Sequence, residues 1–244
     1  MKNLLFLLLL FSVSVIHSQY KMNYRVAPHN PIPLQYTTDH YLIYHKVKSI
    51  RYKNENIDML FSFDEEGKST TLDTGFGITK YNYDKNGFLK SVKTDYTNAK
   101  YKTNADGYIV EEKYSDGSGS KYHYNEKGLY IQKDDLSTGT IIERYGYDNL
   151  DRVTSAIFYD KNTGAISQSS VYSYQDIATH TVISEALTDA YGNNSNNTYY
   201  YTKRGELLST DYKNDVVTYD KKSNPISHYK STEDVTITFD ITYY

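Results

Sequence analysis

A short unit recurs along the chain: an aromatic residue, any residue, a second aromatic residue, Asp or Asn, two further residues and Gly. Its copies, some with one or two substitutions, are "FSFDEEG" from residue 61, "YNYDKNG" from 81, "YKTNADG" from 101, "YHYNEKG" from 122, "YGYDNLD" from 145, "YYYTKRG" from 199 and "VTYDKKS" from 217. The first copies lie about 20 residues apart, and the spacing loosens downstream. A repeat of this length indicates an array of small supersecondary units.

Each unit predicts a β-hairpin. Asp or Asn at the first position of a type I turn accepts hydrogen bonds from the following backbone, and Gly at the fourth position adopts the left-handed conformation that closes the turn with a bulge. The predicted turn residues are Asp64, Gly67, Asp84, Gly87, Asn104, Gly107, Asn125, Gly128, Asp148, Gly205 and Asp220.

The hairpin register predicts which side chains share a face of the sheet. The expected opposed pairs are Tyr83 with Leu89, Thr103 with Ile109, Tyr147 with Val153, and Tyr201 with Leu207. Directly opposed residues lie on the same face, so these residues form the less polar face. The residues expected on the other, solvated face are Lys80, Asn82, Lys90 and Lys102. In "YHYNEKG" the same register sets Tyr124 against Tyr130, and a local shift is expected there.

The rest of the chain supports an all-β fold. The chain has 29 Tyr and no Trp, and tyrosine favours half-buried strands with amphipathic faces. Residues 235–243 alternate apolar and polar side chains, which predicts a sheet strand. Between Ser170 and Asn197 the repeat dissolves, and "YGNNSNN" reads as a long polar loop. We expect an antiparallel meander of roughly a dozen or more short strands, twisted and curling toward a roll or open half-shell.

The amino-terminal residues read as a secretory signal peptide. Lys2 precedes an uncharged run from Leu4 to Ile16, shorter than the roughly 20 apolar residues that span a bilayer. Cleavage is expected after Ser18, and the absence of Cys after the run excludes a lipid-anchored lipoprotein. The expected organisation is a signal peptide at 1–18, an extended proline-containing segment at 19–45 and the hairpin domain at 46–244. The protein is then periplasmic or secreted, without membrane insertion after cleavage.

Charge and cysteine content narrow the expected partners. The full chain has 27 basic and 30 acidic residues, a balance that does not favour nucleic acid. With no Cys, the exported chain is held together by packing and hydrogen bonding alone.

No motif predicts catalysis, a cofactor or a metal. The adjacent acids Glu65 and Glu66, Glu111 and Glu112, or Asp134 and Asp135 would point to opposite faces of a strand and could not flank one glycosidic bond. The histidines His40, His45 and His123 lack ligand spacing. "KTNADG" places Lys102 where a calcium loop needs an acid. We therefore expect no enzyme, no cofactor and no metal site.

The segments "YNYDKNGFLKS", "YHYNEKGLY" and "YGYDNLDRVTS" resemble the YD repeat of the rearrangement-hotspot (RHS) family. The resemblance extends over about residues 57–230. It implies a hairpin sheet that coils into a shell, which in some members encloses a toxic polypeptide and in others serves adhesion. The chain has too few repeats to close a large shell, so an enclosed toxin is not expected.

Three hypotheses about function follow from these patterns. The favoured one is an exported, non-catalytic structural or interaction protein whose partner is a protein or a cell-surface glycan. A glycan-binding module is the first alternative, with a ligand face of exposed rings at Tyr81, Tyr83, Tyr145, Tyr147, Tyr199 and Tyr201. The second alternative is a toxin-accessory or immunity protein. An exported hydrolase assembled only by folding has no sequence feature in its favour.

Overall fold

The structure of the chain is a computed structural model, and it describes residues 45–54, 56–202, 207–208, 215–231 and 234–244. The predicted signal peptide at 1–18 lies outside the described residues. So do nearly all of the predicted extended segment at 19–45, His40 and the predicted turn residue Gly205.

The described residues form eighteen β-strands and no helix. The strands are β1 (Val47–Lys53), β2 (Asp58–Phe63), β3 (Ser69–Asp73), β4 (Ile78–Tyr83), β5 (Leu89–Lys93), β6 (Asn98–Thr103), β7 (Ile109–Tyr114), β8 (Gly119–Tyr124), β9 (Tyr130–Asp135), β10 (Ile141–Tyr147), β11 (Val153–Tyr159), β12 (Ile166–Asp176), β13 (His180–Asp189), β14 (Asn194–Thr202), β15 (Leu207–Leu208), β16 (Val216–Tyr219), β17 (Pro225–Lys230) and β18 (Val235–Tyr243). Within these ranges, no helix is long and apolar enough to cross a membrane.

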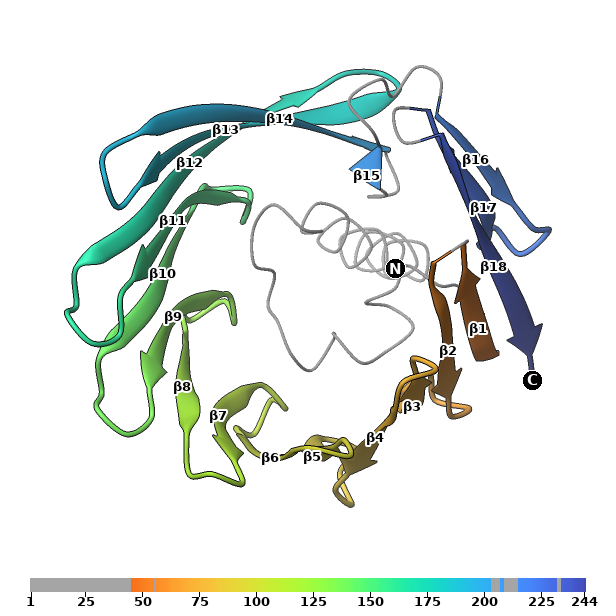
Figure 1. The fold of residues 1–244 in the computed structure, drawn as a ribbon, viewed down its shortest axis with the longest axis horizontal. Helices are drawn as coiled ribbons and strands as arrows, with labels where there is room; N and C mark the ends of the chain where they lie inside the picture. Colours follow the sequence, from red (N-terminus) through yellow and green to blue (C-terminus); the bar gives the residue numbers. More distant parts are fainter. Residues whose placement is uncertain (1–44, 55, 203–206, 209–214, 232–233) are drawn as a thin grey trace, which may run out of the picture.

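The strands form one antiparallel meander in which each strand pairs with its neighbour in sequence, from β1 to β15 and again from β16 to β18. β1 also pairs with β18, so the amino- and carboxy-terminal strands lie side by side (Figure 1). The sheet curls round on itself without closing, and its two free ends are β15 and β16 (Figure 1). The predicted all-β curled meander is confirmed.

The predicted hairpin register is also confirmed. Tyr83 pairs with Leu89, Thr103 with Ile109, Tyr147 with Val153, and Tyr201 with Leu207. In the first three hairpins the register then shifts by one residue, so the first residue of the returning strand and its successor form a bulge. A bulge bends the strand and increases its local twist, and its repetition contributes to the curl of the sheet.

The expected local shift at "YHYNEKG" is wrong. Tyr124 pairs with Tyr130 in the same bulged register as the other hairpins. Tyr130 is buried and occupies the position that Leu89 holds two hairpins earlier. A large ring therefore replaces an aliphatic side chain without changing the pairing.

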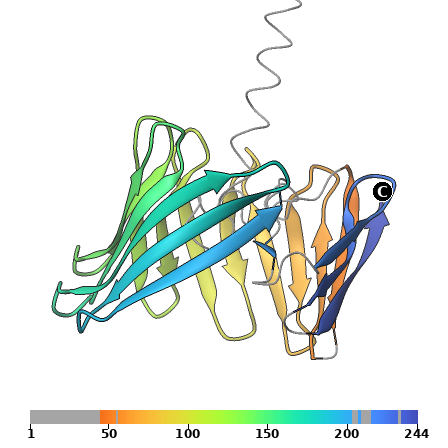
Figure 2. The ribbon, with the colours of Figure 1, turned by 90° about the horizontal axis from the view of Figure 1, so that it is seen from above.

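The prediction of a long polar loop at "YGNNSNN", residues 191–197, is also wrong, because β14 begins at Asn194. β12, β13 and β14 are the longest run of neighbouring strands, with 11, 10 and 9 residues, and they slant across the side of the curl (Figure 2). Asn194, Asn196 and Asn197 all pair with residues of β13. Cross-strand pairing with β13 outweighs the low strand preference of asparagine.

The core lies on the tyrosine face of the sheet. Leu89, Ile109 and Val153 are buried there, packed with the tyrosine rings of the hairpins. A second cluster near the paired chain ends contains Val47, Ile50 and Phe63. β18 alternates buried or half-buried with exposed positions, as its sequence pattern predicts. The other face carries the exposed side chains of Lys80, Asn82, Lys90 and Lys102, as expected.

Candidate functional site

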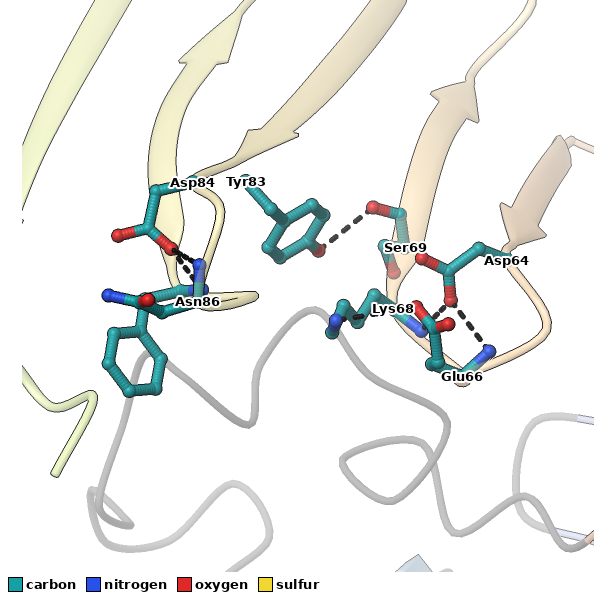
Figure 3. A network of polar contacts seen from close by, with 8 residues as sticks. Asp64, Glu66, Lys68, Ser69, Tyr83, Asp84 and Asn86 are labelled. Atoms are coloured by element: carbon teal, nitrogen blue, oxygen red, sulfur yellow. Dashed lines mark hydrogen bonds and ion pairs between the residues drawn. The ribbon is translucent and has the colours of Figure 1, made fainter.

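The recurring turns have one shared geometry. In the turn after β4, one Asp84 carboxylate oxygen accepts hydrogen bonds from the backbone amides of Asn86 and Phe88, at 2.8 and 2.9 Å (Figure 3). The Gly87 amide donates to the Asp84 carbonyl at 3.0 Å, and Gly87 has a φ of +81°. The same pair of amide contacts is made by Asp64, Asn104, Asn125, Asp148 and Asp220.

Two turns carry another residue at the glycine position. Asp151 and Ser223 adopt φ values of +63° and +65° there. Sequence reasoning missed a further turn of the same geometry at Asp189, where Gly192 has a φ of +82°. It also missed a longer turn at Asp135, where Ser137 and Thr138 donate to the carboxylate. Those hydrogen bonds lower the pKa of Asp135 to about 2.

In several hairpins, a tyrosine just before the turn joins its hairpin to the preceding one. The Tyr83 hydroxyl donates to the carbonyl of Ser69 at 2.9 Å, across the gap between neighbouring hairpins (Figure 3). Ser69 is the first residue of a bulge, where the shift of register takes its carbonyl out of the regular ladder. The tyrosine hydroxyl thus gives this carbonyl a hydrogen-bond partner from the next hairpin.

The same contact recurs at the bulges with which β7, β9 and β11 begin. The hydroxyl groups of Tyr124, Tyr147 and Tyr174 donate to the carbonyls of Ile109, Tyr130 and Val153, at 2.7, 2.5 and 2.7 Å. Each acceptor is the first residue of its returning strand. We call this contact the bulge joint.

A side chain from the preceding turn covers the ring in three of these joints. The Lys68 ammonium lies 5.8 Å from the centre of the Tyr83 ring, and the Arg152 guanidinium lies 4.6 Å from that of Tyr174. The Tyr108 ring stacks on Tyr124 with 5.1 Å between ring centres. Cations and aromatic rings both bind favourably over a tyrosine face, so each joint combines a hydrogen bond with ring packing.

The covering side chains give glycine a second role. A Cβ atom on Gly107 would lie 2.6 Å from the Phe88 ring, and one on Gly128 would lie 2.6 Å from the Tyr108 hydroxyl oxygen. At these two turns, the residue that follows the preceding turn therefore reaches across to the bare glycine backbone. Neighbouring hairpin tips are held together at the same rim of the sheet.

The hairpin of β6 and β7 breaks the pattern. Thr103 stands at the second aromatic position of its unit, and it is too short to reach the bulge at Leu89 and Lys90. The preceding turn still packs against it, because the Phe88 ring lies over Gly107.

Tyrosine hydroxyls, including those of the first tyrosines of several units, donate to carboxylates that are buried or half-buried. The hydroxyls of Tyr101, Tyr114 and Tyr122 donate to Glu112, at 3.0, 2.9 and 2.7 Å. Burial, together with the charge of Glu112, raises the pKa of Tyr122 far above its ordinary value. Sequence reasoning missed this role of Glu112, although the register already sets Glu112 directly opposite Tyr101.

Two further carboxylates act similarly. Glu143 accepts from Tyr145 and pairs with Lys133 at 3.1 Å. Glu185 accepts from Asn197 and Tyr199, at 2.9 and 2.8 Å. Burial alone would raise the pKa of Glu185, but these hydrogen bonds outweigh burial and lower it. These carboxylates therefore hold tyrosine hydroxyls in place.

The six tyrosines of the predicted ligand face belong to this packed face. Tyr145 and Tyr201 are 8% and 2% exposed. The other four are half-buried and pack against the same core cluster. A ring that stacks on a sugar must present one open face, and the protein itself covers Tyr145 and Tyr201.

One open depression of about 560 Å³ lies between the tips of the β6–β7 and β8–β9 hairpins. Its lining includes Asp106, Tyr108, Tyr124, Glu126 and Lys127. Tyr108 and Tyr124 stack on each other, so the walls offer mainly charged and amide groups. His123 also lines the depression, with its Nε2 atom 2.6 Å from an oxygen of Asp134. Among the residues that the structure describes, no three His, Asp or Glu side chains gather as a metal site would require.

Comparisons with known proteins give only distant likenesses. No protein-family profile matches the chain, and no curated protein matches it. The crystal structure of TcdB2-TccC3-Cdc42 matches at 13% identity with a TM-score of 0.32, over 71% of this chain and 12% of that one. A porin-like protein from Bacteroides uniformis matches at 11% identity with a TM-score of 0.41, over 80% of this chain and 98% of that one. The chain thus spans about an eighth of the toxin chain that it matches.

Proposed function

We propose that the protein is an exported, non-catalytic structural and interaction module built from YD-like hairpin repeats. The bulge joint is the observation that carries this proposal. In four hairpins, a tyrosine hydroxyl donates a hydrogen bond to a backbone carbonyl of the preceding hairpin. Tyrosine side chains that bond neighbouring hairpins together stabilise a scaffold. The solvated face of the sheet remains available for contact with partners.

The family proposal rests on the same geometry. The turn carboxylate, the left-handed fourth position and the paired second tyrosine account for three positions of the unit that resembles the YD repeat. A shell that encloses a toxin is not part of the proposal.

Export and the absence of catalysis are tested separately. Intact-mass measurement of protein recovered from the native host should give a chain that begins at Gln19, and retained Met1 and Lys2 would contradict export. The same protein should show no turnover in a broad hydrolase screen with and without divalent metals. Turnover abolished by one substitution that leaves the fold intact would replace the scaffold proposal with an enzyme.

Glycan binding by the tyrosine rings is the less supported alternative, because Tyr145 and Tyr201 lack an open ring face. The toxin-accessory or immunity role stays a prediction that the genomic neighbourhood would test.

A further inference from the structure

The solvated face of the sheet carries two pairs of lysines in direct opposition. Lys80 on β4 pairs with Lys93 on β5, and Lys100 on β6 pairs with Lys113 on β7. All four side chains are exposed. Directly opposed residues of an antiparallel pair have Cβ atoms about 5 Å apart, and like charges there destabilise the sheet. Folding alone therefore gives no reason for this arrangement.

The four lysines also lack compensating acids. In the described residues, no carboxylate oxygen lies within 4.0 Å of their ammonium groups, whereas Lys102 on the same face pairs with Glu111 at 2.7 Å. The whole chain has more acidic than basic residues, so this field is local and opposite to the net charge. A concentrated field of one sign attracts a partner of the other sign.

Polar uncharged groups share the lysine rows. Lys80 pairs with Thr71 on its other side, and Ser91 pairs with both Asn82 and Lys100. The Asn82 amide donates to the Ser91 hydroxyl at 3.3 Å, on the solvated face. Amides and hydroxyls between cations can bond both the hydroxyl groups and the acid groups of a sugar chain.

We propose that this face, defined by Lys80, Lys93, Lys100 and Lys113 and here named the lysine face, binds a linear acidic polysaccharide. The proposal rests on the proposed interaction role and names its partner class. Lys80 and Lys93 lie in one row across β4 and β5, and Lys100 and Lys113 lie in the next row across β6 and β7, so a chain that crosses these strands obliquely meets both pairs. The positions that this face contributes between β3 and β7 include no aromatic ring and no arginine on which a nucleobase could stack. The repeated charges favour a polymer over a small anion.

The test uses the mature protein and polygalacturonate, a linear polyuronic acid, with dextran as the uncharged comparison. Binding to polygalacturonate is expected, with affinity that falls as salt rises, because exposed charges are screened. Dextran should not bind. No binding to polygalacturonate at low salt by folded protein overturns this inference, but it leaves the scaffold proposal standing.

The double variant Lys93→Gln/Lys100→Gln removes one lysine from each opposed pair. Its affinity should fall about tenfold or more, while its melting temperature stays at or above that of the parent, because repulsion is relieved. The control Lys85→Gln/Lys161→Gln changes two exposed turn lysines and should bind like the parent. Equal losses in both variants, or tighter binding to double-stranded DNA or to phosphatidylglycerol vesicles than to polygalacturonate, would overturn the proposal.

Discussion

A tyrosine hydroxyl in the bulge joint has a function that its ring alone cannot supply. Tyr147 packs its half-buried ring in the core and donates to the carbonyl of Tyr130 at 2.5 Å. The sequence predicts that Tyr147 faces Val153, because the partner lies within the same hairpin. It does not predict the carbonyl of Tyr130, because that contact depends on how two separate hairpins lie side by side.

Substitution of Tyr147 separates the two contributions. Tyr147→Phe should lower the free energy of unfolding by about 0.5 to 1.5 kcal/mol, the net value of one hydrogen bond. Tyr147→Ala should lower it by about 3 to 5 kcal/mol, because the packing of a half-buried ring against the core is lost and a cavity remains. Denaturant unfolding measures both, and Tyr96→Phe at a nearly fully exposed turn position is the control. Unchanged stability in Tyr147→Ala would show that the tyrosine face is not core.

The turn glycines are a second test at the residue scale. Gly87→Val should destabilise the protein by about 1 to 3 kcal/mol, because a β-branched residue is strained at positive φ. Lys85→Val in the same turn should cost much less, since Lys85 is exposed and its backbone φ is not in the left-handed region. Similar melting temperatures for the two variants would contradict the turn geometry.

At the scale of the element, the hairpin with Thr103 lacks the tyrosine hydroxyl with which its neighbours form the bulge joint. The bulge at Leu89 and Lys90 has the same register as the bulges that tyrosine hydroxyls reach. The chain therefore contains its own comparison between a complete joint and an incomplete one.

Completion of that joint should stabilise the protein. Thr103→Tyr is expected to place a hydroxyl near the Leu89 carbonyl and to raise the free energy of unfolding by about 0.5 to 1.5 kcal/mol. Thr103→Phe separates the contribution of the ring from that of the hydroxyl. If both variants have equal stability in thermal unfolding, the hydroxyl contact has no value at this position.

Pairing between strands also explains why the sequence-based prediction of a loop at 191–197 was wrong. Asn196 and Asn197 favour turns in isolation, but they lie in β14 because β13 offers a complete ladder. Conversely, the alternation of apolar and polar residues is sufficient by itself to predict β18, because one face of that strand is packed and the other is solvated.

At the scale of the whole molecule, the buried tyrosines link stability to alkaline pH. Burial raises the pKa of Tyr174 to about 12, and burial with Glu185 raises that of Tyr199 to about 12. In the unfolded chain both groups ionise near their ordinary pKa of about 10. The stability they contribute is complete below that pH, and it is lost as the pH rises toward the folded pKa.

We therefore expect the sheet to unfold cooperatively between about pH 10 and 12, because ionisation of tyrosines in the unfolded chain shifts the folding equilibrium toward the unfolded state. Circular dichroism and tyrosinate absorbance, recorded together, should change in one transition. An intact sheet after most tyrosines have ionised near pH 10 would contradict this linkage. The curl of the sheet was predictable from its repeats, whereas the position of its opening depends on which distant strands pair.

The pairing of β1 with β18 determines the order in which the sheet can be completed. Each hairpin joins residues that are close in sequence, so it can form early, whereas Val47 must find Tyr243 at the far end of the chain. Contacts between such distant residues slow folding, because their entropy of closure is lost before they contribute stability. Synthesis from the amino terminus thus leaves β1 with one unpaired edge until the last nine-residue strand has been made.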